Sequence, residues 1–294
     1  MDAIMSGIAR QEWLEPIEKD AQELIHGVFA RGPAGKQAKN FLHGTWLGHP
    51  LHVVLTDIPV GAWSVTLVCD LLNSISSDKA FASAADTSLS IGLVGAAAAA
   101  ATGFTDWQDV DTPARRVGLI HGLLNLGGTS LMLASLIMRK KRSRSWGHGL
   151  AALGYTTAMA AAYLGGKLVF EQKIGVDHAD GELPAKFTTV LAESELLEGE
   201  LKRANFKDTP ILLVRRGKTI YALAETCSHL GGPLSEGEVK GNSVVCPWHG
   251  SRFSLTDGRV LDGPAVHPQP CLEVRVQEGK IQVRKPKGAG VKQK

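Results

Sequence analysis

The sequence predicts two separate folds in one chain, a helical membrane part followed by an all-β part. Residues 49–170 contain long stretches with almost no formal charge, whereas residues 187–286 alternate apolar and polar residues in short runs. The first pattern is typical of membrane-spanning helices and the second of β-strands. We therefore expect an α + β chain in separate domains, with an N-terminal four-helix transmembrane bundle and a C-terminal all-β domain.

The composition agrees with that division and excludes several classes of protein. The 294 residues carry a net charge of +3 and are 44% hydrophobic, which excludes a disordered or collagen-like chain. The near balance of charge argues against a nucleic-acid-binding protein. Four cysteines in so long a chain do not make a disulfide scaffold. Among partners we expect the lipid bilayer and no nucleic acid.

Residues 1–48 are expected to form an amphipathic N-terminal segment. Trp13, Ile17, Leu24 and Val28 recur at helical spacing with charged residues between them, which indicates one helix with an apolar face. Such a helix either packs on the rest of the protein or lies in the membrane interface. The segment lacks the apolar core of a signal peptide.

The middle of the chain provides four stretches suited to crossing a bilayer, which takes about 20 predominantly apolar residues. Small residues such as Gly118 and Gly122 would let these helices approach closely. A soluble bundle is the alternative, but it needs a polar face on each helix. The expected spans are residues 51–73, 83–105, 117–138 and 146–168.

The loop charges predict an orientation. The loop after the third span holds Arg139, Lys140, Lys141, Arg142 and Arg144, and basic loops stay in the cytoplasm. Four spans then place both ends of the chain, including the all-β domain, on the outer side. A cytoplasmic location of the all-β domain is the alternative, because an outer location requires the polar N-terminal residues to cross the membrane without a signal sequence.

Several polar residues lie at the depth of the expected spans, namely His49, His52, Asp57 and His121. Ionisable residues inside a membrane are candidates for function, since burying them is costly. A histidine pair can ligate haem iron, so His52 or His49 together with His121 could hold haem b. Quinone binding is another possibility. The alternative is a structural cluster in which the histidines bond Asp57 or Asn125 and fix the helix packing.

The C-terminal third of the chain is organised around short strands. Residues 171–186 are polar and contain Gly and Pro, so they are expected to be a linker, and residues 287–294 a basic tail. Between them, apolar runs are separated by Gly, Asp and Pro, which is an all-β pattern. The clearest strand candidates are residues 187–191, 211–214, 219–223, 243–245, 272–276 and 280–283.

Two short loops in this β segment each supply one cysteine and one histidine. Cys227 and His229 form a C-x-H motif, and Cys246 and His249 form a C-x-x-H motif. Thiolate and imidazole suit zinc or an iron–sulfur centre. Zinc is the alternative, although zinc fingers more often pair like ligands within one loop. The mixed loops favour a centre with two different metal atoms, each taking one ligand from each loop.

These loops resemble those of the Rieske [2Fe-2S] domain, and the resemblance covers essentially all of residues 187–286. It implies a small antiparallel β fold with a cluster-binding subdomain at about residues 225–266. It implies that Cys227 and Cys246 ligate one iron and that His229 and His249 ligate the other.

The resemblance also implies which residues surround the cluster. Glycines in the first loop would let the backbone approach the cluster sulfurs. Trp248 would shield the cluster or form part of a docking surface, and a third loop around Pro264 would cover it. The residues expected near the cluster are Gly231, Gly232, Trp248, Ser251, Phe253 and Pro264.

Three positions depart from the cytochrome-complex branch of this family. Gly232 and Trp248 stand where that branch carries a disulfide, and Phe253 stands where it carries a tyrosine near a cluster thiolate. Ser251, the other usual hydroxyl donor, is kept. With fewer hydrogen bonds to the cluster, the potential should lie well below about +300 mV, the top of the Rieske range. The loops instead resemble the ferredoxin-like branch that serves oxygenases and reductases.

The expected function is one-electron transfer by a membrane-anchored Rieske protein, to or from a partner protein, quinone or haem. The chain would then be an electron-transfer component of an oxidoreductase system rather than a complete enzyme. The alternatives are a redox-sensing cluster that controls a membrane ligand-binding or transport domain, and the cluster component of a multi-subunit oxygenase. The membrane half resembles four-helix bacterial membrane domains of unknown function that open with a similar run to residues 49–52 (His-Pro-Leu-His), which implies the bacterial inner membrane.

Overall fold

The computed structural model describes residues 3–30, 32–111, 113–141 and 143–286, and within it the chain forms two compact units. The first unit takes in the residues up to His43 together with Pro50–Ile174. The second takes in Gly44–His49 and the residues from Gly175 onward. The helices belong to the first unit and the strands to the second. The basic tail expected at residues 287–294 lies outside the described residues.

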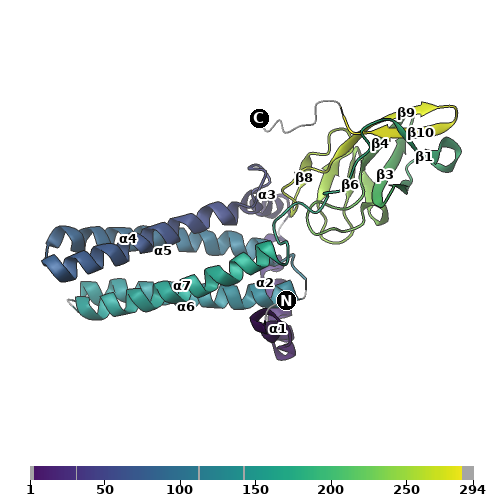
Figure 1. The fold of residues 1–294 in the computed structure, drawn as a ribbon. Coiled ribbons are helices and arrows are strands. Elements are labelled where there is room, and N and C mark those ends of the chain that lie inside the picture. Colours follow the sequence, from purple (N-terminus) through teal and green to yellow (C-terminus); the bar gives the residue numbers. More distant parts are fainter. Residues whose placement is uncertain (1–2, 31, 112, 142, 287–294) are drawn as a thin grey trace. The chain divides into compact units, whose positions relative to one another are not determined.

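Four long helices dominate the first unit, and each contains the span expected from the sequence (Figure 1). The first helix packs along the second and the third along the fourth, so the helices form two hairpins. Each hairpin therefore brings together two helices that are consecutive in the chain. The helices are α4 (Leu51–Ser76), α5 (Lys79–Trp107), α6 (Ala114–Lys140) and α7 (Arg144–Phe170).

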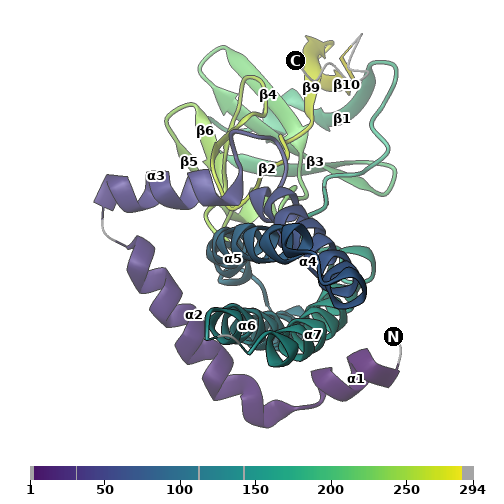
Figure 2. The ribbon, with the colours of Figure 1, turned by 90° about the vertical axis from the view of Figure 1, so that its left-hand side faces the viewer.

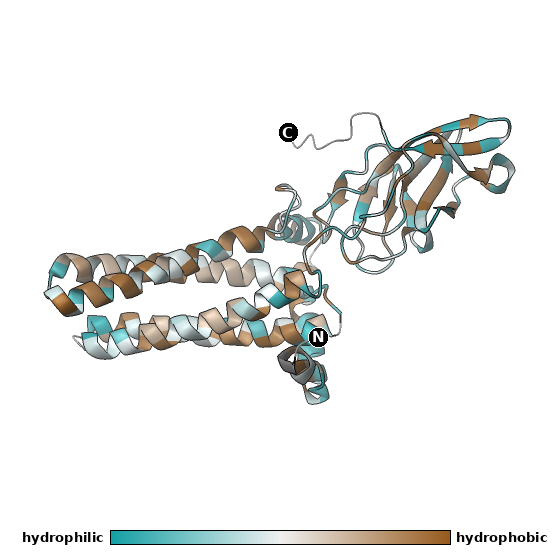
Figure 3. Cartoon of the chain, in the orientation of Figure 1, coloured by the Kyte–Doolittle hydropathy of each residue, from teal (hydrophilic) through white to brown (hydrophobic). Residues whose placement is uncertain are grey.

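Three of these helices, α4, α5 and α6, are long and apolar enough to cross a membrane. Apolar side chains on α4 face outward at helical spacing, with Val65, Val68, Leu71 and Ile75 each at least half exposed. Figure 3 shows this apolar character along the helix. A large exposed apolar face is costly in water and favourable in lipid. α7 is as long but rich in alanine and glycine, so a fourth span remains a prediction.

Small residues allow the helices within each hairpin to approach closely. A Cβ atom on Gly92 of α5 would lie 2.2 Å from Nε1 of Trp63 on α4. Gly128 of α6 and Gly154 of α7 face each other, and a Cβ on either would come within 2.9 Å of the other's carbonyl oxygen. The predicted small-residue packing therefore occurs within both hairpins. Gly118 packs instead on the ring of Trp107.

The amphipathic helix predicted from the spacing of Trp13 to Val28 is confirmed as α2, but two further helices that were not expected complete the N-terminal segment. The segment contains α1 (Ala3–Ala9), α2 (Glu15–Phe29) and α3 (Gly32–His43), with a 3-10 turn before α2. Pro16 is compatible only with the first turn of a helix, so α2 begins there. Gly32, with φ of +69°, begins α3. Figure 2 shows these helices lying around one end of the four long helices.

Two antiparallel sheets form the second unit. The larger has the strand order β1-β10-β9-β4-β3-β2, and the smaller has the order β5-β6-β7-β8. All six predicted strands are confirmed, whereas four short or polar strands (β2, β5, β7 and β8) were not expected. The strands are β1 (Thr188–Ala192), β2 (Leu201–Phe206), β3 (Thr209–Arg216), β4 (Thr219–Ala224), β5 (Glu238–Lys240), β6 (Ser243–Val245), β7 (Arg252–Ser254), β8 (Val260–Asp262), β9 (Cys271–Gln277) and β10 (Lys280–Arg284).

Strand β3 separates two apolar cores. Ile211 and Leu213 face a core of the larger sheet, while Leu212 and Val214 face a core shared with the smaller sheet. Because successive side chains alternate between the faces of a strand, a continuous apolar run is buried on both sides. The shared core also contains Phe253 and the two cysteines of the predicted metal motifs, so the base of the candidate site is part of the hydrophobic interior.

Candidate metal centre

The first cysteine loop begins directly after the larger sheet, beyond the end of β4. The N–H of Cys227 donates to the carbonyl of Gly232 at 2.8 Å, and the N–H of Gly231 donates back to the carbonyl of Cys227 at 2.9 Å. Gly231 has a φ of +81°, a conformation that costs glycine little. These bonds close a tight loop in which Cys227 stands at the start and His229 near the tip.

The second cysteine loop joins β6 to β7 and repeats this main-chain pattern. The N–H of Cys246 donates to the carbonyl of Ser251 at 2.8 Å, and the N–H of Gly250 donates to the carbonyl of Cys246 at 3.1 Å. Gly250 has a φ of +74°. One loop geometry is therefore built twice, each time with a cysteine at its first position.

The two loops bring the four predicted ligands together as two pairs. The thiols of Cys227 and Cys246 are buried and share a hydrogen bond. The rings of His229 and His249 are partly exposed, with centroids 5.1 Å apart and planes at 88°. The sulfur pair thus lies on the interior side of the loops and the imidazole pair on the solvent side.

The arrangement of these ligands in two pairs bears on whether the site holds zinc or an iron–sulfur centre, the two alternatives that the sequence allows. Within the part of the chain that the structure describes, no three His, Cys, Asp or Glu side chains converge as ligands of one ion. A structural zinc ion requires four ligands around a single atom. A Rieske centre requires two cysteines at one iron and two histidines at the other. The donor set and its separation into pairs fit the second requirement.

The two thiols have different acidities because they are in contact. The hydrogen bond from Cys227 lowers the pKa of Cys246 to about 7, although burial opposes this shift. The same hydrogen bond, together with burial, raises the pKa of Cys227 well above its ordinary value. The pair therefore already favours one thiolate near neutral pH, the form in which cysteine binds metals.

Gly232 and Trp248 hold the two loops against each other. A Cβ atom on Gly232 would lie 2.9 Å from Sγ of Cys246 and 3.1 Å from Cγ of Trp248. The Trp248 ring is 54% exposed and meets the His249 ring edge-on, with 6.3 Å between the ring centroids. Trp248 therefore both packs on the first loop and presents an aromatic surface to solvent beside a candidate ligand.

The remaining residues expected near the cluster are buried around the second loop. Phe253 lies in the shared core with both cysteines. The Ser251 hydroxyl is fully buried and accepts the N–H of Ala265 at 2.9 Å. That bond attaches the third loop, which contains the buried Pro264, to the second one. Three loops are thus connected at this end of the unit.

Sequence reasoning missed the buried Gln269, which anchors the first loop. Its Oε1 accepts the N–H of Ser228 at 3.1 Å, and its Nε2 donates to the carbonyls of Ala224 and Thr226 at 2.7 and 2.6 Å. An uncharged side chain outside any motif gives no signal in one sequence. Only the tertiary structure shows that it bonds one N–H of the loop and two carbonyls of the residues that lead into it.

The residues considered for haem or a polar cluster lie in three different places. The rings of His52 on α4 and His121 on α6 lie together, with centroids 6.4 Å apart. His49 belongs to the segment grouped with the other unit, and Asp57 is exposed on α4. Asn125 donates to Nε2 of His121 at 3.1 Å. Of the residues considered for haem or a polar cluster, the structure thus pairs His52 with His121.

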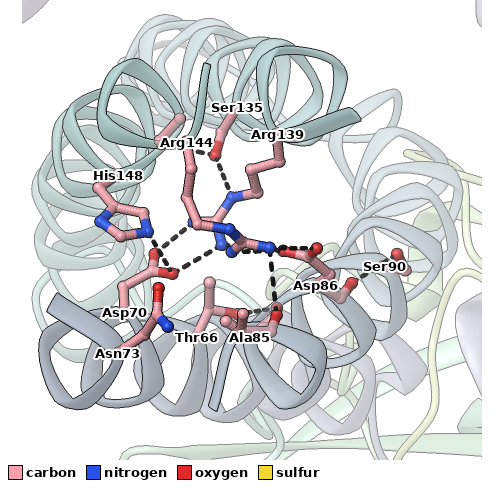
Figure 4. A network of polar contacts seen from close by, with 12 residues as sticks. Thr66, Asp70, Asn73, Ala85, Asp86, Ser90, Ser135, Arg139, Arg144 and His148 are labelled. Carbon is pink, nitrogen blue, oxygen red and sulfur yellow. Dashed lines mark hydrogen bonds and ion pairs between the residues drawn. The ribbon is translucent and has the colours of Figure 1, made fainter. Parts of the chain in front are cut away.

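A second polar network, not anticipated from the sequence, occupies the other end of the four helices (Figure 4). The buried Arg139 pairs with Asp70 and, at 3.1 Å, with Asp86. Arg144 pairs with Asp86 at 2.6 Å, and Nε2 of His148 lies 3.2 Å from Asp70. Two of the arginines counted as loop charges are therefore neutralised within the helical unit.

Comparison with known families covers both units. Residues 186–277 match the Rieske [2Fe-2S] domain, and residues 48–178 match a family described as a predicted membrane protein (DUF2231).

Ferredoxin CarAc of Metapseudomonas resinovorans is 35% identical over 95 residues, which are 32% of this chain and 89% of that protein. The cytochrome bc1 complex Rieske iron-sulfur subunit of Streptomyces lividans is 32% identical over 38% of this chain and 64% of its own length. Apoptosis-inducing factor 3 of Mus musculus is 30% identical over 34% of this chain, and the match spans 17% of that protein.

Among solved structures, a complex of reduced oxygenase and oxidized ferredoxin in carbazole 1,9a-dioxygenase contains a chain 33% identical to this one. The match covers 34% of this chain and 94% of that chain, with a TM-score of 0.33.

Proposed function

This chain belongs to the Rieske [2Fe-2S] proteins, and on that premise we propose that it is a membrane-anchored carrier of single electrons. Its relatives include ferredoxins and the iron-sulfur subunits of cytochrome complexes, which act in electron transfer. The observation that supports the proposal is the repeated loop geometry, with its buried sulfur pair and partly exposed imidazole pair.

Four side chains would hold the cluster, Cys227 and Cys246 at one iron and His229 and His249 at the other. When bound, the cluster supplies a centre that accepts and releases one electron. The buried cysteines would attach that centre to the apolar core, of which they are part. The partly exposed histidines provide the side from which a partner can approach. Trp248, beside His249, enlarges this side as an aromatic docking surface.

The helical unit would anchor this carrier in the bacterial inner membrane. Its family match and its three apolar helices support membrane association, and we propose that α7 completes a four-helix transmembrane bundle. We place residues 187–286 on the outer side and expect a redox protein or quinone as partner.

Replacement of one imidazole ligand tests the assignment. His249→Ala should abolish the Rieske EPR signal and visible spectrum of the full-length protein in detergent, because one iron loses half of its protein ligands. The matched control is His267→Ala, a histidine of the same unit outside both cysteine loops, which should keep both signals. An unchanged Rieske spectrum in His249→Ala would refute the assignment. So would colourless wild-type protein after anaerobic reconstitution with iron and sulfide.

The ferredoxin relatives favour one second candidate, the cluster component of a multi-subunit oxygenase. The two functions differ in what oxidises the reduced protein. A carrier for quinone or haem should be reoxidised rapidly by a soluble quinone analogue in a stopped-flow experiment. An oxygenase component should react slowly with quinone and rapidly with a partner that contains mononuclear iron.

A further inference from the structure

We propose that His52 and His121 are the two axial ligands of a b-type haem held between the two helical hairpins. The existence of this site is independent of the proposed electron-transfer function. Its role as a redox partner for the Rieske domain does rest on that function. The site lies near the start of α4 and the end of α7, which is the end of the helical unit from which the chain continues to residues 175–286.

The two histidines are held in the same way in the two hairpins. His52 of α4 bonds the carbonyl of Ala99 on α5 through Nδ1 at 2.8 Å. His121 of α6 bonds the carbonyl of Ala161 on α7 through Nδ1, also at 2.8 Å. In both hairpins the first helix carries the histidine and the second provides the carbonyl. The repetition indicates a defined orientation for both rings.

Glycines make room for both rings at equivalent positions. A Cβ atom on Gly103, four residues after Ala99, would lie 2.7 Å from Cε1 of His52. A Cβ atom on Gly165, four residues after Ala161, would lie 3.1 Å from Cε1 of His121. A side chain at Gly103 would therefore collide with the His52 ring, and one at Gly165 would force a small shift of the His121 ring.

The hydrogen bonds from Nδ1 to the carbonyls of Ala99 and Ala161 determine which ring nitrogen is available to a metal. A carbonyl oxygen only accepts hydrogen bonds, so Nδ1 of each ring is the donor and a metal would bind at Nε2. A histidine whose other ring nitrogen donates to a backbone carbonyl is the usual arrangement for a metal ligand. His52 and His121 thus each keep Nε2 as the ring nitrogen at which a metal would bind.

The separation and number of the ligands point to haem iron rather than to a bare ion. Two imidazoles on opposite sides of one metal, each at a bond length of about 2 Å, have ring centres about 6 Å apart. The observed distance is 6.4 Å. No third His, Cys, Asp or Glu ligand converges there among the described residues. Two ligands leave a bare ion incompletely coordinated, whereas haem iron already has four nitrogens from its macrocycle.

Haem also matches the rest of the site. The residues of α5 and α7 that contact the two rings are all small, and none of them is charged: Ala99, Thr102, Gly103, Ala161 and Gly165. The sequence has no C-x-x-C-H motif, so the haem would be bound without covalent attachment. Asn125, which donates to Nε2 of His121 at 3.1 Å and to the His121 carbonyl at 3.0 Å, would have to turn away from the ring.

The test is haem binding by the full-length protein, expressed with a haem precursor and purified in detergent. We expect about one b-type haem per chain with the low-spin EPR signature of two imidazole ligands. His52→Ala and His121→Ala should each reduce the bound haem by at least about tenfold. His121→Met, which retains an axial ligand, should keep haem at an altered potential. His148→Ala at the other end of the helices is the matched control and should bind haem normally.

The Rieske signal separates this inference from the proposed function. His52→Ala should keep the Rieske EPR signal, while His249→Ala should lose it and keep the haem spectrum. The inference is overturned if the wild-type protein, expressed with the precursor, shows no haem absorption. It is equally overturned if both alanine variants bind as much haem as the wild type, or if Asn125→Ala abolishes binding as completely as His121→Ala does.

Discussion

Ser251 illustrates how one hydroxyl can be positioned to tune the cluster. Its oxygen accepts the N–H of Ala265, so the hydroxyl proton is not used in that bond. The side chain is fully buried in the second cysteine loop, and a hydrogen bond to a cluster sulfur or thiolate stabilises the reduced, more negative state. Phe253, in the neighbouring strand, provides no such donor.

Ser251→Ala should therefore lower the reduction potential of the cluster. A hydrogen bond to a charged group worth about 1.5 kcal/mol corresponds to a shift on the order of 60 mV for one electron. A redox titration followed by EPR measures it. Ser254→Ala, three residues along the chain, is the control and should leave the potential unchanged. An equal or higher potential in Ser251→Ala would show that this hydroxyl does not bond the cluster.

Gly232 is the residue at which the two cysteine loops come closest. Gly232→Ala should force the loops apart, because its Cβ would lie 2.9 Å from Sγ of Cys246. We expect a destabilisation of about 1–3 kcal/mol and less iron per chain, measured by thermal unfolding and metal analysis. Gly149→Ala, where no atom lies within 4 Å of the added Cβ, should change neither quantity. Full iron content in Gly232→Ala would contradict this packing.

At the scale of elements, α3 is attached through a cluster of charges at its last turn. Nδ1 of His43 lies 2.7 Å from Asp106, and its Nε2 lies 3.5 Å from Asp109, which is too long for a good hydrogen bond. Lys39 contacts Asp109 at 2.8 Å. Burial alone would lower the pKa of His43, but the two carboxylates raise it above its ordinary value. Burial likewise opposes the shift of Asp109, whose pKa His43 and Lys39 lower to about 2.

These shifts predict how the attachment of α3 depends on pH. The raised pKa of His43 means that its contribution is complete below about pH 6.5 and is lost as the pH rises through the higher folded value. Asp109 contributes above pH 3.8 and loses its contribution as the pH falls towards 2. Hydrogen-exchange protection of residues 32–43, corrected for intrinsic rates, should therefore fall between pH 6 and pH 9. His43→Gln should remove most of this dependence, and equal protection at both pH values in the wild type would contradict it.

At the scale of the whole molecule, the ion pairs of Arg139 and Arg144 weaken the positive charge of their loop but do not abolish it. Lys140 and Lys141 remain exposed beside them. The opposing loop is further neutralised, because Arg115 and Arg116 both pair with the buried Glu18 of α2. The contrast between the two ends of the helices therefore still favours the 139–144 end in the cytoplasm.

Protease added to intact spheroplasts should thus digest residues 187–286 from outside, detected by loss of a C-terminal epitope. In inverted vesicles the same residues should be protected. Lys140→Glu combined with Lys141→Glu removes the exposed cations and should reduce the uniformity of this orientation. Digestion in inverted vesicles and protection in spheroplasts would place the Rieske domain in the cytoplasm.

The sequence by itself determined what depends on local patterns. Charge-free stretches specified the long helices, alternating runs specified most strands, and the Cys and His spacing specified the two loops of the Rieske domain. Strand β7 escaped prediction because its one apolar residue stands between polar ones, whereas the equally short β6 contains two adjacent valines. Helix α1 was missed because seven residues are too few for a helical pattern, and α3 because its large apolar residues lie only near its end.

Only the tertiary structure decided which distant side chains meet. Gln269 bonds three backbone groups in and just before the first cysteine loop. Asp70 pairs with Arg139, and the ring centroids of His52 and His121 lie 6.4 Å apart. Each of these contacts joins residues at least 40 positions apart in the chain. These contacts form only when the helices pack and the strands pair in the correct register. Burying a polar group costs free energy, and that cost is offset only when a partner from another element bonds the group.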